Sequence, residues 1–359
     1  MLSSQIEQIH HNLNESFPAL CRIAIALYDE ETDMLKTFTH STRGAVPIQY
    51  YSSRLSESES LSKLAESRVT RIIDDITAIT SDRTHTKRIK AAGFRSSLTY
   101  PIYNKDKFVG ILFMNAKEIA FFSEETVKKL AIFIQLISTL LIAETLPIKT
   151  LKGAVATARE FSRIKDEETG AHLARMSHYA RLIGLEIGEK HDLNDEAIEY
   201  IFQFSPLHDV GKVGIPDAVI LKKGPLTGDE REVVQTHVSV GENIINTMVD
   251  KFDLGGVENV QMLRNIVAFH HEAYDGSGYL KGLKGEEIPI EARITSVADV
   301  FDALTSARPY KRAWTNREAF AFLEEKKGAM FDPDCVDALI NNKELVQAIQ
   351  ERFKEDKLG

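Results

Sequence analysis

The sequence has few cysteines and no excess of basic residues. Only Cys21 and Cys335 occur among 359 residues. Both lie in apolar segments, which excludes a disulfide framework and predicts a reducing compartment. The 53 acidic residues outnumber the 44 basic ones, which gives a formal net charge of −9. Proteins that bind polymeric nucleic acid normally carry a basic stripe, so this balance argues against such a partner, although a small basic pocket could still hold a phosphate.

The sequence also lacks a recognisable signal peptide or membrane anchor. Residues 1–8 have neither the basic start nor the apolar stretch of a signal peptide. The most apolar run, Leu130–Ala143, is shorter than the roughly 20 residues that span a bilayer, and three polar residues interrupt it. We therefore expect a cytoplasmic protein without membrane insertion, in which this run forms a buried or dimerising helix.

The first part of the chain, residues 1–146, mixes short strands with helices. Cys21–Leu27 and Met34–Phe38 flank a polar turn, which predicts a hairpin. Ser97–Tyr103 and Phe108–Asn115 are apolar segments separated by residues of turn composition, which predicts a second hairpin. Together these patterns predict an α+β domain.

A helical connector follows the second hairpin. The helix-prone pattern begins after Ser123, continues to Thr145, meets Pro147 and resumes over Leu151–Phe161. Proline should end or kink the first helix, because it lacks a backbone N–H and its ring clashes with the preceding turn. Such a connector favours a homodimer interface, and the alternative is that it packs only on its own domain.

The remainder of the chain predicts an all-α domain over residues 147–340, followed by a charged tail over residues 341–359 that we expect to be an exposed helix. Each predicted helix has apolar residues at the helical period. The expected helices are Val155–Arg163, His172–Glu189, Asp195–Phe204, Asp229–Met248, Val257–His271, Ala292–Thr305, Asn316–Lys327 and Pro333–Ile340.

Seven side chains on these helices or at their ends form a candidate ligand set for two metals. They are His172, His208, Asp209, His237, His270, His271 and Asp299. A pair of divalent ions needs nitrogen and oxygen donors and a bridging carboxylate, for which Asp209 is the natural candidate. Asp299 lies in an apolar helix, where an unpaired carboxylate would be costly. Each residue alone could be a core histidine or a capping aspartate, but the whole set favours a metal centre.

The N-terminal region resembles a GAF sensory domain over roughly 140 residues. The resemblance is carried by the segments Gly93–Pro101, Val109–Phe113 and Phe121–Glu125. It implies a fold and a sensory role without identifying a ligand. His85, in a polar stretch, is expected to be a solvated loop residue.

Residues 150–335 resemble the HD-GYP subgroup of HD-domain phosphodiesterases. The resemblance is carried by the segments His208–Pro216, His270–Tyr279, Gly282–Pro289 and Ala298–Lys311. It implies hydrolysis of cyclic di-GMP to the linear dinucleotide pGpG or to GMP by a metal-activated water. It also implies a two-metal centre, of iron or alternatively manganese, held by the seven residues above.

Further residue roles follow from the same resemblance. Lys212 is expected to act beside Asp209 as the catalytic cation facing a phosphate oxygen, with pairing to a local carboxylate as the alternative. Arg308 and Lys311 correspond to substrate contacts, and the alternative is solvated surface charge. Glu168 could hold a third metal or could instead meet the dipole of a helix N-terminus.

The chain departs from the family signature at Leu280, where the subgroup has proline. Leucine removes a backbone restraint from the loop over residues 275–285. That loop is a candidate contact for a protein partner. Two alternatives to a cyclic di-GMP phosphodiesterase therefore stay open. One is a metal-bound receptor or scaffold that binds cyclic di-GMP with little activity, and the other is a hydrolase of another cyclic dinucleotide.

Overall fold

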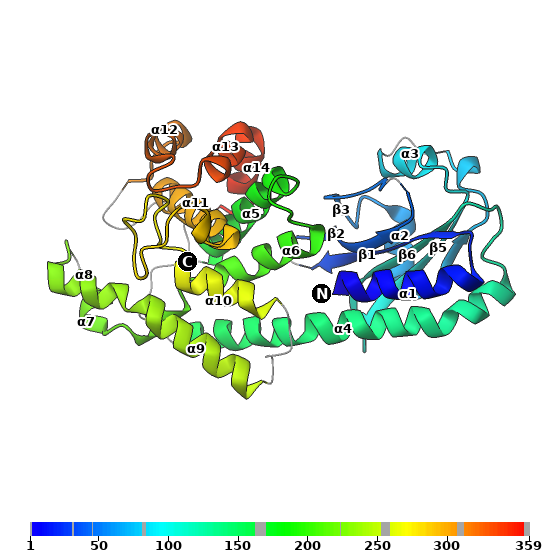
Figure 1. The fold of residues 1–359 in the computed structure, drawn as a ribbon, viewed down its shortest axis with the longest axis horizontal. Helices are drawn as coiled ribbons and strands as arrows, with labels where there is room; N and C mark the ends of the chain where they lie inside the picture. The colour runs from blue at the N-terminus through cyan, green and yellow to red at the C-terminus, as the bar shows by residue number, and fades with distance from the viewer. Residues whose placement is uncertain are drawn as a thin grey trace. The chain divides into compact units, whose positions relative to one another are not determined.

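The computed structural model describes residues 2–30, 32–44, 46–80, 84–161, 170–222, 224–252, 259–306 and 312–354. The chain divides into two compact units, Met1–Leu146 and Pro147–Gly359. The first unit is α+β and the second is helical, and the predicted fold class is confirmed in both (Figure 1).

The first unit is built on a six-stranded antiparallel sheet in the order β3-β2-β1-β6-β5-β4. Both predicted hairpins are present, as the pairs β1/β2 and β5/β6. The strands are β1 Leu20–Asp29, β2 Met34–Thr42, β3 Ser52–Arg54, β4 Arg71–Ile73, β5 Ser96–Asn104 and β6 Lys107–Ala116.

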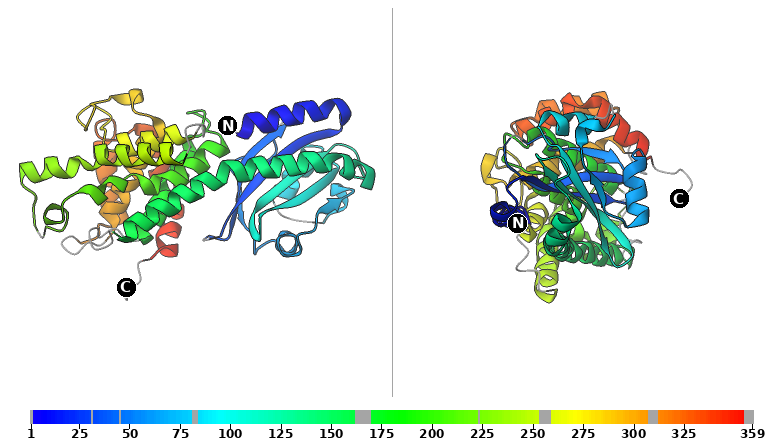
Figure 2. Two further views of the ribbon diagram at one scale, coloured as in Figure 1. Left: turned by 90° about the horizontal axis from the view of Figure 1, so that it is seen from below. Right: turned by 90° about the vertical axis from the view of Figure 1, so that its right-hand side faces the viewer.

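Helices cover this sheet on both sides. The helices of the unit are α1 Leu2–Ser16, α2 Glu59–Ser67, the 3-10 turn η1 Ile76–Ala78, α3 Thr84–Ala91 and the start of α4 Glu124–Phe161. Along one face α1 and the first part of α4 lie side by side (Figures 1 and 2). Near α2, Leu64 is buried in a cluster with Ala26, Leu35 and Ile111, so the face of the sheet next to α2 is also covered by apolar side chains.

Cys21 and Cys335 are both free and buried.

The connector differs from the prediction at Pro147. Helix α4 continues through this residue as a single element of 38 residues, so of the two predicted effects, an end or a kink, the end is wrong and the kink stays a prediction. Proline removes one hydrogen bond of the helix, and helical residues continue on both sides of it.

The apolar part of α4 is also longer than expected from Leu130–Ala143. Its segment Glu124–Leu151 is long and apolar enough to cross a membrane by length and composition, and only 28% of its most apolar window is buried. The argument from length against a membrane span is therefore wrong, and the absence of membrane insertion stays a prediction.

The second unit contains α-helices joined by short 3-10 turns. They are α5 Gly170–Ile187, α6 Asp195–Phe204, η2 Ser205–Leu207, η3 Val210–Gly214, α7 Asp217–Ile220, α8 Gly228–Gln235, α9 His237–Lys251, α10 Val260–Phe269, η5 Gly285–Glu287, α11 Ile290–Thr305, α12 Asn316–Lys326, α13 Pro333–Asn341 and α14 Lys343–Arg352. The core lies around α5, which packs against α6, α11 and α13.

Two elements of this unit correct the sequence prediction. The helix expected over Asp229–Met248 is split at Thr236, so His237 begins α9 rather than lying inside a helix. The Thr236 hydroxyl donates to the Val233 carbonyl at 2.6 Å, which helps to end α8. The C-terminal helix α14 is not a fully exposed tail, because it packs on α5 and buries Val346.

Candidate metal centre

His208 and Asp209 lie between two short 3-10 turns rather than on one α-helix. His208 ends η2 with φ −51° and ψ −40°, whereas Asp209 precedes η3 with φ −97° and ψ 17°. On a regular α-helix neighbouring side chains diverge by about 100°. A change of backbone conformation between the two residues allows both side chains to face the same site.

Close packing of η3 on α9 brings Asp209 to His237. A Cβ atom added at Gly211 would lie 1.8 Å from the His237 carbonyl oxygen and 2.4 Å from the Gly241 nitrogen. Only glycine permits this approach, because any side chain would push the two elements apart. Gly211 was visible in the sequence, but the sequence alone did not show which helix it faces.

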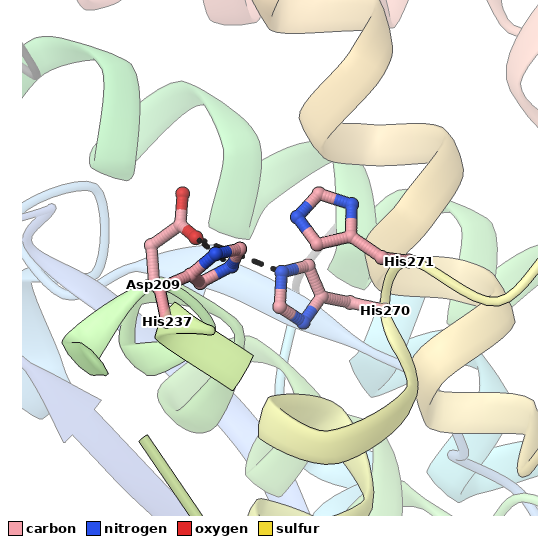
Figure 3. A group of neighbouring side chains, drawn as sticks. All are labelled: Asp209, His237, His270 and His271. Carbon is pink, nitrogen blue, oxygen red and sulfur yellow. Dashed lines mark ion pairs between the residues drawn. The ribbon is translucent and has the colours of Figure 1, made fainter. Parts of the chain in front are cut away.

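Four of the predicted ligands converge on one point. Ligand atoms of Asp209, His237, His270 and His271 all lie within 4.8 Å of one another (Figure 3). Asp209 Oδ1 is 3.0 Å from His237 Nε2 and 3.6 Å from His270 Nε2. His270 caps the C-terminus of α10 and His271 follows it, so the end of one helix supplies two rings.

The other three predicted ligands form a second group beside the first. Asp299 Oδ1 is 3.7 Å from His172 Nε2 and 3.7 Å from His208 Nε2. His208 Nε2 is also 3.0 Å from Asp209 Oδ2. The two oxygens of Asp209 thus face different groups, as expected of a bridging carboxylate.

Hydrogen bonds fix which nitrogen of each ring faces the centre. The Nδ1 atoms of His208, His237 and His270 lie 2.8, 2.7 and 3.0 Å from carbonyl oxygens three or four residues earlier in the chain. A carbonyl can only accept, so each Nδ1 is the donor and each Nε2 carries a lone pair. This is the tautomer that binds a metal through Nε2.

Several polar atoms at the centre lack a hydrogen-bond partner. His237 Nε2, His270 Nε2 and Asp209 Oδ1 are buried and make no hydrogen bond of acceptable geometry among the described residues. Buried polar atoms are normally satisfied, and lone pairs of nitrogen and oxygen facing one another at about 3 Å repel. A divalent cation would satisfy all three atoms, so the residues present fit a metal.

The electrostatic environment favours the protonation states that bind metals. Burial would raise the pKa of the Asp209 carboxyl, but Lys212 and His208 outweigh it and hold this pKa well below its ordinary value. Burial, followed by the proximity of His270, holds the pKa of His271 well below its ordinary value, and burial lowers the pKa of His270. Metal ligation requires an ionised carboxylate and neutral imidazoles.

Asp302 supports His172 from the side of the ring away from the centre. His172 Nδ1 donates to Asp302 Oδ2 at 2.8 Å, while Arg175 donates to both oxygens of the same carboxylate at 2.7 and 2.9 Å. The Ser306 hydroxyl adds a contact at 2.9 Å. Asp302 is fully buried, so this network satisfies its charge and fixes the His172 ring.

The remaining predicted residues have different outcomes. Lys212 Nζ lies 2.7 Å from Asp209 Oδ2. This is the ion pair with a local carboxylate that we considered as the alternative to a phosphate contact. Arg308, Lys311 and Glu168 lie outside the described residues.

Tyr279 and Glu272 also lie at the site, although the sequence motifs did not single them out. The Tyr279 ring stacks on His271 with ring centroids 4.9 Å apart. The buried Glu272 carboxylate accepts hydrogen bonds from the backbone nitrogens of Lys281 and Leu283 at 2.7 and 3.1 Å. Glu272 thus holds the 275–285 loop near the histidines, and its position directly after His271 was the available signal.

Comparisons with known proteins agree with this geometry. The HD domain family model matches residues 163–335. The cyclic di-GMP phosphodiesterase response regulator RpfG of Xanthomonas campestris is 46% identical over 189 residues, which cover 53% of this chain and 47% of that protein. The 3'3'-cGAMP-specific phosphodiesterase 2 of Vibrio cholerae is 37% identical over 194 residues, which cover 54% of this chain and 35% of that protein.

A structural comparison concerns the first unit. The GAF domain of an Acinetobacter phosphoenolpyruvate-protein phosphotransferase covers 40% of this chain and 84% of that structure, at 16% identity and a TM-score of 0.32. A likeness at this level says nothing about a ligand. The chain spans about half the length, or less, of the curated relatives described above. The match to the HD domain family over residues 163–335 and the converging ligands both lie in the second unit.

Proposed function

We propose that this chain is a metal-dependent phosphodiesterase of the HD-GYP subgroup that hydrolyses cyclic di-GMP to pGpG or GMP. The observation that carries the proposal is the convergence of His237 Nε2, His270 Nε2 and Asp209 Oδ1 without hydrogen-bond partners among the described residues. Relatives named as cyclic di-GMP phosphodiesterases support the substrate class.

The proposed centre holds two divalent ions, one in each ligand group. Asp209, His237, His270 and His271 would hold one ion. His172, His208 and Asp299 would hold the other, and Asp209 would bridge the two through its second oxygen. Iron is the proposed metal and manganese the alternative, because imidazole and carboxylate donors suit both. Glu168 remains the candidate ligand of a third ion.

When bound, divalent metal ions acidify a water molecule and neutralise charge on the phosphate oxygens. The side chains of the chain provide positioning. Asp209 stays ionised because Lys212 is only 2.7 Å away. In the proposed complex Lys212 faces a non-bridging phosphate oxygen, where its charge favours the negative transition state. Arg308 and Lys311 are the proposed contacts to the dinucleotide.

The proposal includes regulation by the GAF-like first unit and a homodimer through α4. Ile132 is 69% exposed and Leu136 is 44% exposed on this helix. The exposed positions Ile132, Leu136, Thr139, Ala143 and Leu146 recur at spacings of three and four residues, as in a two-helix interface. A second copy of the chain would cover this apolar stripe. The 275–285 loop, with Leu280 exposed, is the proposed contact for a protein partner.

Two other functions fit particular observations. Leu280 in place of the signature proline favours a metal-bound receptor or scaffold that binds cyclic di-GMP with little turnover. The similarity to a 3'3'-cGAMP-specific phosphodiesterase favours a hydrolase of that mixed dinucleotide.

The discriminating experiment combines metal analysis with product chromatography. The purified chain is analysed for bound metal and incubated separately with cyclic di-GMP and 3'3'-cGAMP in the presence of Fe²⁺ or Mn²⁺. The enzyme proposal expects bound metal and conversion of cyclic di-GMP, and it expects Asp209→Ala to lose both. Tight binding without turnover would favour the receptor. Full metal occupancy in Asp209→Ala would overturn the bridge assignment, and Asp229→Ala, which changes an aspartate on α8 outside the ligand set, serves as the matched control.

A further inference from the structure

The first unit contains a cavity of about 580 Å³ between the sheet and helices α2 and α3. Strands β1, β2, β4, β5 and β6 all contribute lining residues. Small side chains on the floor leave this space open, among them Ala24, Ala26 and Ser97. Ligand cavities of several hundred Å³ with mostly apolar walls and a few polar groups are typical of small-molecule sites.

The apolar part of the cavity comes from aliphatic and aromatic residues. Leu35, Ile48, Ile73, Ile76 and Phe113 line it. His85 and Tyr51 lie at the same cavity, with ring centroids 5.9 Å apart. His85 belongs to α3 and is half-buried, so its expected place in a solvated loop is wrong. These residues can contact an apolar ligand body.

Two arginines give the cavity positive charge. Arg22 is almost fully buried, and its guanidinium donates to Asn115 Oδ1 at 3.1 Å. Asn115 Nδ2 in turn donates to Ser97 Oγ at 3.1 Å. The strand register places Arg22, Asn115 and Ser97 across neighbouring strands. A polar row thus crosses one end of the floor.

Arg71 on β4 is the second cation. Its guanidinium contacts the hydroxyls of Ser60 and Thr99, the latter at 3.1 Å. Within the described part of the chain no carboxylate lies within ion-pair distance of it, and its buried Nε has no hydrogen-bond partner. Glu59, the one acidic residue among the described lining residues, is paired with Lys63 at 2.6 Å. Burial lowers the pKa of Arg71, as expected of a cation without a nearby anion.

We propose that this cavity binds a small amphipathic anion, with a carboxylate or phosphate on the Arg71 guanidinium and an apolar body against Ile73, Ile76 and Phe113. A partly buried guanidinium forms strong, directed hydrogen bonds with such groups. A bound anion would provide the negative charge that balances Arg71, which its neutral hydroxyl partners cannot provide. The site lies wholly within the first unit, and its occupation does not require phosphodiesterase activity.

The test measures binding of three probes with the same alkyl chain to the full chain by calorimetry. Octanoate carries a carboxylate, octyl phosphate carries a phosphate, and 1-octanol is uncharged. The proposal expects at least one anion to bind roughly tenfold or more tightly than octanol, because hydrogen bonds to charged groups contribute more than neutral ones. The preferred anion identifies the headgroup.

Three variants locate the site. Arg71→Gln should weaken binding of the preferred anion roughly tenfold and leave octanol unchanged. Arg68→Gln is the matched control, because Arg68 pairs with the exposed Asp106 and does not line the cavity. Ala24→Phe should weaken binding of all three probes by filling the floor.

Equal affinity for octanol and both anions in the unmodified chain would overturn the proposal, and this comparison does not depend on any variant folding. Absence of binding by all three probes would also overturn it. An Arg71→Gln protein that melts like the unmodified chain and keeps full anion affinity would place any anion site elsewhere and contradict the assignment to Arg71.

Discussion

Replacing Asp302 by asparagine should destabilise the second unit and weaken one of the two proposed metal sites. The change keeps the shape of the side chain but removes the charge that accepts hydrogen bonds from His172, Arg175 and Ser306. Arg175 would remain almost fully buried without its carboxylate partner. Breaking one side of a buried ion pair costs about 3–5 kcal/mol of unfolding free energy.

The effect on metal binding follows from the His172 contact. An asparagine amide can present its nitrogen to His172 Nδ1, which would disturb the ring orientation. Loss of such a supporting contact typically lowers metal affinity about 10–100-fold. We therefore expect weaker Mn²⁺ binding in a competition titration against a chromophoric chelator, together with a lower midpoint in urea unfolding.

Two further variants make this prediction specific. Asp334→Asn removes a half-buried carboxylate that pairs with Lys190 at 2.6 Å and His191 at 2.8 Å, and should cost about 1 kcal/mol or less. The double variant Asp302→Asn with Arg175→Met removes both buried charges and should recover part of the lost stability. The reasoning is refuted if Asp302→Asn unfolds within about 1 kcal/mol of the unmodified chain, or if the double variant is no more stable than Asp302→Asn alone.

Three other predictions concern packing, pH and metal. Gly211→Ala should lose several kcal/mol of stability and bind metal poorly, because the new Cβ atom would overlap the His237 carbonyl. In Gly228→Ala the new Cβ atom meets no atom within 4 Å, so this control should be nearly neutral in the same urea unfolding and Mn²⁺ titration. Burial raises the pKa of the Glu291 carboxyl, so the stability that the protonated carboxyl contributes is fully present below the unfolded pKa and is lost as pH rises through the folded pKa. Glu291→Gln should therefore be more stable than the unmodified chain at pH 7 and equally stable near pH 4. Equal urea midpoints of the two proteins at both pH values would contradict this. Removal of metal by a chelator should lower the melting temperature, and added Mn²⁺ should restore it. At a Mn²⁺ concentration 100 times the Kd the metal should stabilise the folded state by about 2.7 kcal/mol, and His237→Ala should lose this effect. A chelated chain whose melting temperature does not change when Mn²⁺ is added would count against a metal site in the folded state.

The sequence predicted the positions of the helices better than the breaks and continuities within them. The apolar period located α5, α6, α11 and α13 closely, because helical periodicity is a local property. It did not reveal the break at Thr236, since the residues around it continue the helical pattern. It also allowed a helix end at Pro147, where α4 continues. The period of the apolar residues does not by itself decide either case.

The seven predicted metal ligands show the same contrast. Residue type and motif led to all seven side chains, and the structure brings them together in two adjoining groups. The motif did not indicate that Gly211 sets the distance from Asp209 to His237, or that Tyr279 stacks on His271. Both contacts depend on how turns and loops pack in three dimensions, which the motif does not encode.

The hydrogen bonds behind the histidines imply an order in which the centre can assemble during folding. His208, His237 and His270 are oriented by carbonyls only three or four residues away, so each ring can take its final direction as soon as its own turn forms. His172 instead depends on Asp302, which is 130 residues distant, and can be oriented only after α5 docks on α11. The ring directions of these three histidines are therefore set by short-range structure, whereas the direction of the His172 ring depends on long-range packing.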